Sequence, residues 1–363
     1  MKKFCRLLSI ILLSICFNCT SEPQTYTIET IDGVPHIHNL APIWGDEPKI
    51  ELEFIQRIGD LETADENYQL YKPRDVAKDS EGNIYIIDTG NYCVKKYDRN
   101  GRFIQKFGNK GQGPGEFSIP MWIFISPDNE VYIWDVRLRG GLHVFNTDGE
   151  YRRIFNRDKE NISLNSITPV GNFVFRIGSA DSKKLVRITD NNMNTIAEFG
   201  KVILNEDGTP SRRKNGFEQA SSNKGDIFLV FRSRNRLEKY SGKGQPLLTF
   251  SRELPYEESE ESYPVYRDGQ ITAYTTNVFS HTIQTDHKNR VWITTAKDQI
   301  VENRSKPGSM MFEIYNEEGV LLSRMESNLL ALTTSFKIYG DRLFIVDTFK
   351  DHCVYEYRIN EHK

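Results

Sequence analysis

The amino-acid sequence predicts an all-β protein that folds as a six-bladed β-propeller with four-stranded blades. Three observations support this fold class. The 363 residues are 38% hydrophobic and 12% aromatic, and short apolar runs alternate with turn signals, a pattern that favours strands over helices. A unit of four short strands recurs along the chain, and its last copy lacks one strand that the N-terminal region can supply.

The clearest unit spans Pro73–Phe117, and its alternating apolar segments predict four strands. These strands lie near residues 74–79, 83–88, 92–98 and 102–108. An Asn-Gly step separates the third segment from the fourth, and such a step between alternating runs is a strong hairpin signal. The unit therefore reads as a four-stranded antiparallel sheet.

The second strand of this unit recurs five more times, each time followed by a further alternating segment. The copies lie at residues 128–135, 170–178, 224–233, 288–295 and 339–347. Units of about 40–50 residues with four strands each are typical of propeller blades. Six copies predict six blades, which together occupy residues 48–360.

The two ends of the repeat region predict how the ring closes. The last copy contains three predicted strands and lacks the fourth. An orphan alternating segment precedes the first copy and predicts a strand at about residues 49–58. We expect this N-terminal strand to complete the last blade, because such pairing removes an open sheet edge.

The first unit resembles an NHL repeat, which relates the chain to the six-bladed propeller family of exported bacterial proteins and lipoproteins. The residues that carry the resemblance are Gly82–Asp88, Asn91, Val94, Tyr97, Asp98, Gly101, Phe107, Gly108 and Gly111–Phe117. The match is strongest in the first blade and weaker in blades 3 to 5. The resemblance implies a fold more firmly than an activity.

The N-terminus predicts an export signal of the lipoprotein type. Three basic residues precede an apolar run from Leu7 to Phe17, which is too short to span a bilayer and fits a signal peptide. The segment resembles a lipobox, which implies lipidation of Cys19, although Asn18 departs from the usual small residue. We expect a signal over residues 1–18, a tether over residues 19–47, and a membrane-anchored protein at the outer membrane or on the periplasmic side.

Two cysteines remain in the predicted mature domain. Cys93 and Cys353 occupy the same position of the third strand in the first and last blades. Equivalent positions of neighbouring blades should lie farther apart than the ~7 Å that a disulfide allows between Cα atoms. We therefore predict two buried free thiols.

The glycine-rich stretch at residues 108–117 has the spacing of a phosphate-binding loop. That chemistry requires a helix after the glycines, whereas the residues that follow are β-patterned and contain two prolines. We instead expect Gly111, Gly113 and Gly115 to adopt positive φ angles, where the chain crosses from the first blade to the second.

Candidate ligand-binding residues gather at the predicted loops after the second strands. Arginines recur there, and two further side chains near the first strands of blades 1 and 2 can join them. The set is Arg74, Trp122, Arg137, Arg139, Arg176, Arg232 and Arg234. Arginine binds carboxylates in a bidentate manner, so this face suits an anionic small molecule or an acidic glycan. The alternative is that these arginines are solvated turn residues or form salt bridges between blades.

Composition and motifs favour a non-catalytic binding module over an enzyme. The net charge is −3, which argues against a nucleic-acid partner. His281 is the one histidine on a predicted innermost strand, where a structural role is expected. We expect a monomeric, membrane-tethered protein that binds an anionic ligand or an envelope protein and needs no cofactor. The alternative is a lactonase- or lyase-type enzyme with a divalent cation such as calcium in the channel; an envelope assembly factor is a third alternative.

Overall fold

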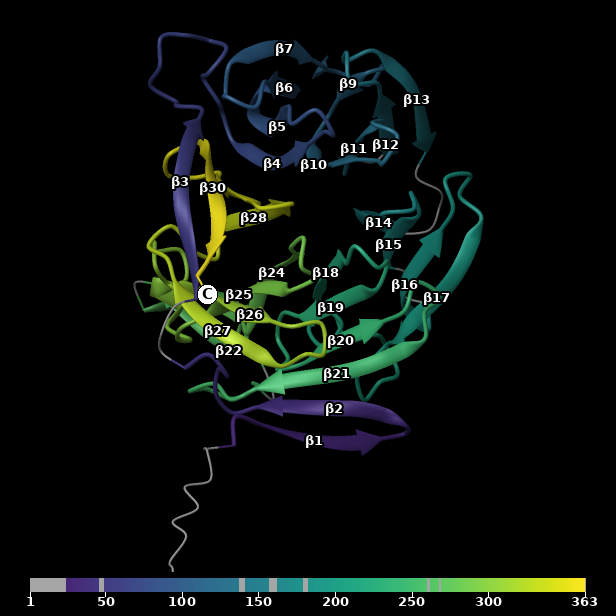
Figure 1. Cartoon of the computed structure of the whole chain (residues 1–363), viewed down its shortest axis with the longest axis vertical. Coiled ribbons are helices and arrows are strands. Elements are labelled where there is room, and N and C mark those ends of the chain that lie inside the picture. Colours follow the sequence, from purple (N-terminus) through teal and green to yellow (C-terminus); the bar gives the residue numbers. More distant parts are fainter. Residues whose placement is uncertain are drawn as a thin grey trace, which may run out of the picture.

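Six four-stranded sheets form a ring in the computed structural model, so the predicted six-bladed propeller is confirmed (Figure 1). The structure describes residues 24–45, 49–136, 141–156, 162–178, 182–259, 262–267 and 269–362. Within these ranges the only helical elements are two 3-10 turns, η1 (Thr89–Asn91) and η2 (Val301–Asn303).

The blades follow one another in chain order, each with its first strand innermost. Blade 1 consists of β4 (Pro73–Lys78), β5 (Ile84–Asp88), β6 (Cys93–Tyr97) and β7 (Phe103–Phe107). Blade 2 consists of β10 (Pro120–Ile125), β11 (Val131–Asp135), β12 (Gly141–Phe145) and β13 (Tyr151–Asn156). Blade 3 consists of β14 (Ile162–Ile167), β15 (Phe173–Ile177), β16 (Lys184–Thr189) and β17 (Thr195–Lys201).

The second half of the ring repeats this plan. Blade 4 consists of β18 (Phe217–Ser221), β19 (Ile227–Phe231), β20 (Leu237–Tyr240) and β21 (Pro246–Arg252). Blade 5 consists of β24 (Ser280–Thr285), β25 (Val291–Ala296), β26 (Met310–Tyr315) and β27 (Leu321–Glu326). Blade 6 consists of β28 (Thr334–Tyr339), β29 (Arg342–Asp347), β30 (Cys353–Glu361) and β3 (Ile50–Ile58). Within the described residues, two two-stranded sheets lie outside this plan, β8 (Asn109–Lys110) with β9 (Glu116–Phe117) and β22 (Tyr263–Arg267) with β23 (Gln270–Thr275). A further hairpin, β1 (Tyr26–Ile31) with β2 (Val34–Asn39), extends the sheet of blade 4.

The turns between the strands of blade 1 explain why its sequence folds as hairpins. The Asp79 carboxylate accepts hydrogen bonds from the backbone N–H groups of Glu81 and Asn83, at 3.0 and 2.8 Å. Gly82 supplies the positive φ angle of +92° that the turn requires. Asp98 caps the next turn in the same way. An acidic residue followed three positions later by glycine therefore acts as a local folding signal.

The predicted closure of the ring is confirmed. β3 pairs antiparallel with β30, from Ile50 opposite Glu361 to Ile58 opposite Val354. Strands from opposite ends of the chain thus share one blade, and Figure 1 shows them side by side. This pairing covers the outer edge of β30, which would otherwise lie open.

The segment predicted as a tether is in part a structured hairpin. β1 and β2 pair with each other, and β2 adds in parallel to β21, which makes blade 4 a six-stranded sheet. Asn39 at the end of β2 is fully buried. Its side-chain amide donates to the carbonyls of Ser251 and Gly319 and accepts from the N–H of Leu321. The hairpin is therefore attached to both blade 4 and blade 5.

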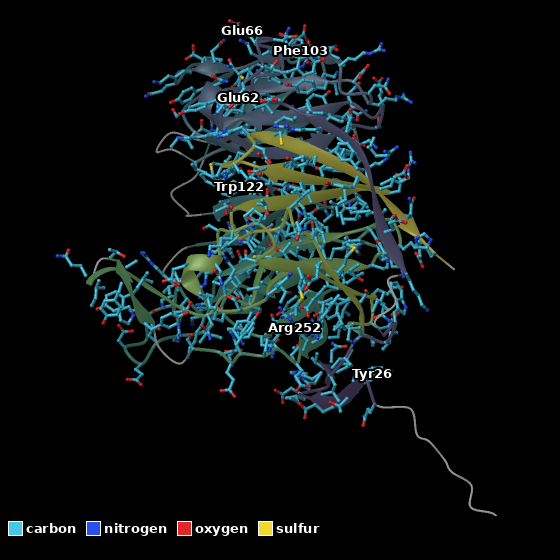
Figure 2. The ribbon with its side chains drawn as sticks, turned by 90° about the vertical axis from the view of Figure 1, so that its left-hand side faces the viewer. Tyr26, Glu62, Glu66, Phe103, Trp122 and Arg252 are labelled. Atoms are coloured by element: carbon cyan, nitrogen blue, oxygen red, sulfur yellow. The ribbon has the colours of Figure 1, made fainter. Side chains whose placement is uncertain are left out.

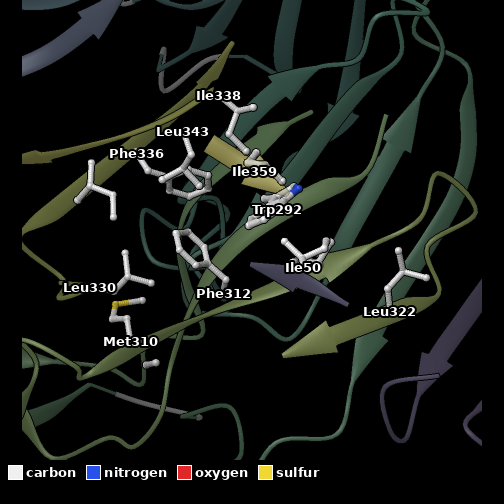
Figure 3. Close-up of a cluster of buried hydrophobic side chains, with 13 residues drawn as sticks. Ile50, Trp292, Met310, Phe312, Leu322, Leu330, Phe336, Ile338, Leu343 and Ile359 are labelled. Atoms are coloured by element: carbon white, nitrogen blue, oxygen red, sulfur yellow. The ribbon is translucent and has the colours of Figure 1, made fainter. Parts of the chain in front are cut away.

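The hydrophobic core lies between neighbouring blades. In the cluster of Figure 3, the buried rings of Trp292, Phe312 and Phe336 lie edge to face, with centroids 5.5 and 5.1 Å apart. These rings come from β25 and β26 of blade 5 and β28 of blade 6. The indole N–H of Trp292 donates to Asp286 at 3.0 Å, so the buried polar atom is satisfied.

The glycine-rich loop carries the chain from blade 1 to blade 2, but the expectation for its backbone was partly wrong. Of the three glycines, only Gly115 has a positive φ angle, +74°. Gly111 is needed for space, because a Cβ atom there would lie 1.9 Å from Oε2 of Glu116. That oxygen accepts hydrogen bonds from the N–H groups of Gln112 and Gly113, at 2.9 and 2.8 Å. A carboxylate of the chain itself thus occupies the anion-binding loop.

The predicted free thiols are confirmed. Cys93 and Cys353 are both buried and unbonded to another cysteine. They begin β6 and β30, the third strands of blades 1 and 6. Burial raises the pKa of the Cys93 thiol to about 12, which keeps it protonated and unreactive at neutral pH.

Candidate functional site

The first strands of the blades surround a central channel. β4, β10, β14, β18, β24 and β28 contact one another in ring order. Near one mouth, side chains from several of these strands line a cavity of about 330 Å³, which we call the arginine cavity. The residues of interest in its lining are Arg74, Trp122, Glu218, Arg232, His281 and Phe349.

Arg74 stands out within the arginine cavity because no acidic side chain among the described residues pairs with it. It lies on β4 and is half-buried. Within the ranges that the structure describes, its side chain forms neither a hydrogen bond nor an ion pair, whereas the other two cations of the cavity have acidic partners. A half-buried guanidinium without a counter-ion favours an anion from outside the chain.

Arg232 lies between a histidine and a carboxylate. Its guanidinium lies 3.2 Å from Nδ1 of His281 and 3.8 Å from the Glu218 carboxylate. Burial, together with the charges of Arg232 and Arg74, lowers the pKa of His281 to about 3. The ring is therefore neutral at pH 7. Because Nδ1 accepts from Arg232, the proton of His281 lies on Nε2, which is a hydrogen-bond donor.

A second ion pair lies deeper in the same cavity. Lys337 Nζ lies 3.6 Å from the Asp75 carboxylate and 5.3 Å from the centre of the Phe124 ring. Asp75 also accepts a hydrogen bond from the N–H of Ile123 at 3.0 Å. Lys337 and Asp75 therefore balance each other, as do Arg232 and Glu218, and Arg74 remains the surplus charge.

The structure brings together three of the predicted site residues, Arg74, Trp122 and Arg232. Arg176 lies beside them without lining the cavity; its guanidinium packs 5.1 Å over the Phe217 ring, and burial lowers its pKa. Arg234 lies apart, in a different cavity beside the hairpin β1–β2. Arg137 and Arg139 lie outside the described residues. The predicted positive face is therefore smaller than seven residues.

The sequence interpretation missed Glu218 and Lys337 and assigned His281 only a structural role. All three residues lie on first strands, β18, β28 and β24. Their position on the first strands could have identified them, because polar residues on the innermost strands must face the channel or a neighbouring blade. Position in the loop after a second strand predicted the residues of the cavity less well than position on a first strand.

Metal binding was the chemistry of the enzyme alternative. No three His, Cys, Asp or Glu side chains gather into a candidate metal site among the residues that the structure describes. The arginine cavity holds two carboxylates, and each faces a cation of the chain.

Comparison with known families supports the fold. Residues 49–223 match the DUF5128 family, described as a six-bladed β-propeller. A search of curated proteins finds no match. Within the described residues, no helix is long and apolar enough to cross a membrane.

Solved structures show the same architecture at low identity. A protein of Bacteroides fragilis described as exported is 12% identical, with a TM-score of 0.57 over 90% of this chain and 99% of that chain. A DUF4221 member from Bacteroides vulgatus is 11% identical, with a TM-score of 0.55 over 86% and 98% of the two chains. The PQQ-bound aldose sugar dehydrogenase of Streptomyces coelicolor is 12% identical, with a TM-score of 0.52 over 86% and 99%. At such identities the similarity extends to the fold alone.

Proposed function

We propose that this protein is a non-catalytic binding module of the bacterial envelope that holds a carboxylate-bearing ligand, such as an acidic glycan, in the arginine cavity. The observation that carries the proposal is Arg74, which lines the cavity together with Arg232 and whose half-buried guanidinium has no acidic partner in the described part of the chain. The ligand carboxylate would accept paired hydrogen bonds from Arg74. The Nε2–H of His281 would donate a further bond.

The remaining lining suits a sugar ring. Trp122 and Phe349 both line the cavity, and Phe349 is 58% exposed. Aromatic rings present an apolar face that packs against the C–H groups of a ligand while its polar groups are bound elsewhere. A uronic acid, with one carboxylate and several hydroxyls, combines both requirements.

The ionisation of His281 supports binding rather than acid–base catalysis. A general base works best when its pKa lies near the working pH, whereas the pKa of His281 is lowered to about 3. Burial raises the pKa of Glu218 above its ordinary value, and the charges of Arg232 and Arg176 oppose this rise. The proposal assigns Glu218 to holding the Arg232 guanidinium, 3.8 Å away, in place for the ligand.

Calorimetric titration with galacturonate and with galactose tests the proposal. We expect binding of the acid but not of the neutral sugar, and roughly tenfold to a hundredfold weaker binding after Arg74→Ala. Arg212→Ala, which removes an exposed arginine that does not line the cavity, is the matched control and should leave the affinity unchanged. Equal affinities of Arg74→Ala and wild type would sink the proposal. A stoichiometric divalent cation in the purified protein would favour the lactonase- or lyase-type alternative.

The envelope location rests on the N-terminal sequence pattern and has its own test. We expect the wild-type protein to fractionate with membranes through a lipid on Cys19, and Cys19→Ser to release it into the soluble fraction. Metabolic labelling with palmitate checks the modification directly. Membrane association that persists unchanged in Cys19→Ser would refute lipid anchoring at this residue.

A further inference from the structure

A second cavity lies next to the arginine cavity and has no role in the function proposed above. Its volume is about 450 Å³, and the side chains that matter in its lining are Tyr71, Lys72, Tyr92 and Lys110. We call it the tyrosine groove. Its described lining contains these two lysines and no acidic residue.

Each lysine of the groove lies over a tyrosine ring. Lys72 Nζ lies 5.4 Å from the centre of the Tyr71 ring, and Lys110 Nζ lies 5.1 Å from that of Tyr92. Neither ammonium group has an ion-pair partner within the described part of the chain. A cation over an aromatic ring is held only weakly at an exposed site, so both lysines can move to meet an anion.

The backbone that presents these side chains adopts an unfavourable conformation. Lys72, Tyr92 and the neighbouring His352 have positive φ angles of 64°, 55° and 47°. Such angles cost side-chain-bearing residues roughly 1–2 kcal/mol each. Lys72 and Tyr92 line the groove, and His352 lies beside it, since Lys72 N–H donates to Nδ1 of His352 and the rings of Tyr71 and His352 stack with centroids 6.2 Å apart. Tyr92 adopts its left-handed conformation as the C-cap of η1, so the turn fixes the place from which its side chain enters the groove.

The tyrosine groove is also rigidly built. The N–H of Tyr71 donates to the buried Asp88 carboxylate at 2.9 Å, and the carbonyl of Tyr71 accepts from the N–H of Gly90 at 2.8 Å. Any side chain at position 90 would clash with the Tyr71 backbone, because a Cβ atom there would lie 2.1 Å from the Tyr71 oxygen. Tyr71 is nevertheless 46% exposed. It is thus a fixed aromatic surface that faces solvent.

Two chain segments connect the tyrosine groove to the arginine cavity. In the first segment, Tyr71 and Lys72 line the groove and Arg74 lines the cavity. In the second segment, Ser118 lines the groove and Trp122 lines the cavity. Three residues of extended chain span at most about 10 Å, so the Cα atoms of Tyr71 and Arg74 lie within that distance. A short oligosaccharide can reach both places at once.

We propose that the tyrosine groove is a second sugar subsite, and that the ligand is an oligosaccharide with carboxylates on more than one unit. One unit places its carboxylate at Arg74, and another packs against Tyr71 or Tyr92 with its carboxylate at Lys72 or Lys110. This inference rests on the proposed function, because it extends the same site. It adds that the affinity depends on ligand length.

The test compares galacturonate with its linear oligomers in calorimetric titrations of the wild type and of Tyr71→Ala/Lys110→Ala. We expect the wild type to bind the oligomer more tightly than the monomer, by about fivefold for each lysine engaged. The double variant keeps Lys72 and Tyr92, so it should retain the wild-type affinity for the monomer and lose about fivefold of the preference for the oligomer, the share of one lysine. Tyr274→Ala/Lys243→Ala, which removes an exposed tyrosine and an exposed lysine elsewhere, is the matched control and should keep the preference for the oligomer.

The outcomes separate the two proposals. Equal affinity of the wild type for monomer and oligomer would overturn the second subsite and leave the arginine cavity standing. A double variant that keeps the full preference, or that loses the monomer as well, would also overturn it. Absence of binding by either ligand would refute the proposed function itself. Tighter binding of an oligoglutamate peptide than of the sugar oligomer would replace the glycan with an acidic peptide.

Discussion

Replacing Glu313 by glutamine should destabilise the fold more than any comparable surface change. Glu313 on β26 is fully buried, and its carboxylate accepts hydrogen bonds from Nε of Arg252 at 2.8 Å, from Nε of Arg324 at 2.9 Å and from Thr295 at 2.7 Å. Arg252 on β21 is itself fully buried. Figure 2 shows that Arg252 and Trp122 lie in different parts of the molecule.

The magnitude follows from the charge that glutamine would leave behind. Two unit charges about 4 Å apart interact by roughly 4 kcal/mol at an effective dielectric constant near 20, and breaking a buried pair costs about 3–5 kcal/mol. Arg252 would keep neutral acceptors, namely Ser280 at 2.8 Å and the Phe279 carbonyl at 3.3 Å. We therefore expect Glu313→Gln to lower the free energy of unfolding by about 3 kcal/mol, the lower end of that range.

Urea unfolding at pH 7, followed by tryptophan fluorescence, measures this loss. The matched control is Glu326→Gln, because the Glu326 side chain is 78% exposed and pairs with Lys297 at 3.0 Å; its cost should stay below about 1 kcal/mol. Burial raises the pKa of Glu313, but Arg252 and Arg324 together lower it below its ordinary value. The stabilisation is thus present at neutral pH and lost in acid. A Glu313→Gln variant within about 1 kcal/mol of wild type would refute the reasoning.

Three further stability predictions come from single contacts. Because the pKa of His281 is lowered to about 3 in the folded protein, the unfolded protein takes up a proton there at a higher pH. Stability should therefore fall as the pH drops from ~6.5 towards 3, and thermal unfolding of His281→Asn should show a flatter pH dependence than that of the wild type. Equal slopes would contradict the assignment. Gly111→Ala should lower the free energy of unfolding by about 2 kcal/mol, because the new Cβ displaces the Glu116 carboxylate. The control Gly216→Ala, whose Cβ would meet atoms no closer than 3.5 Å, should be nearly neutral. Similar melting temperatures of the two variants would exclude the steric role of Gly111. Asn39→Ala leaves three backbone groups without their side-chain partner, two of them in buried hydrogen bonds. Hydrogen exchange should therefore accelerate in β1 and β2 but not in β24, and an unchanged rate in the hairpin would disprove the attachment.

The repeat made the ring predictable from the sequence, since each blade carries the same alternation and turn signals. The hairpin β1–β2 was missed although its signal was present. Asp32 and Gly33 separate two alternating runs and have positive φ angles of 51° and 78°, the combination that a tight two-residue hairpin turn requires. What no local signal shows is the parallel pairing of β2 with β21. That contact joins residues more than 200 positions apart and depends on the open edge that blade 4 presents.

The arginines show why the site could be predicted only in part. Arg232 and Arg234 are two residues apart after β19, yet one lines the channel and the other faces the hairpin β1–β2, because a loop imposes no fixed side-chain period. Arg74 lies on a strand, where alternation fixes the direction of each side chain. Placement on the innermost strand therefore predicts channel residues better than loop equivalence does, although the loop residues Arg232 and Phe349 also line the cavity. By that criterion, Lys337 and Glu218 belong to the site although no motif marks them.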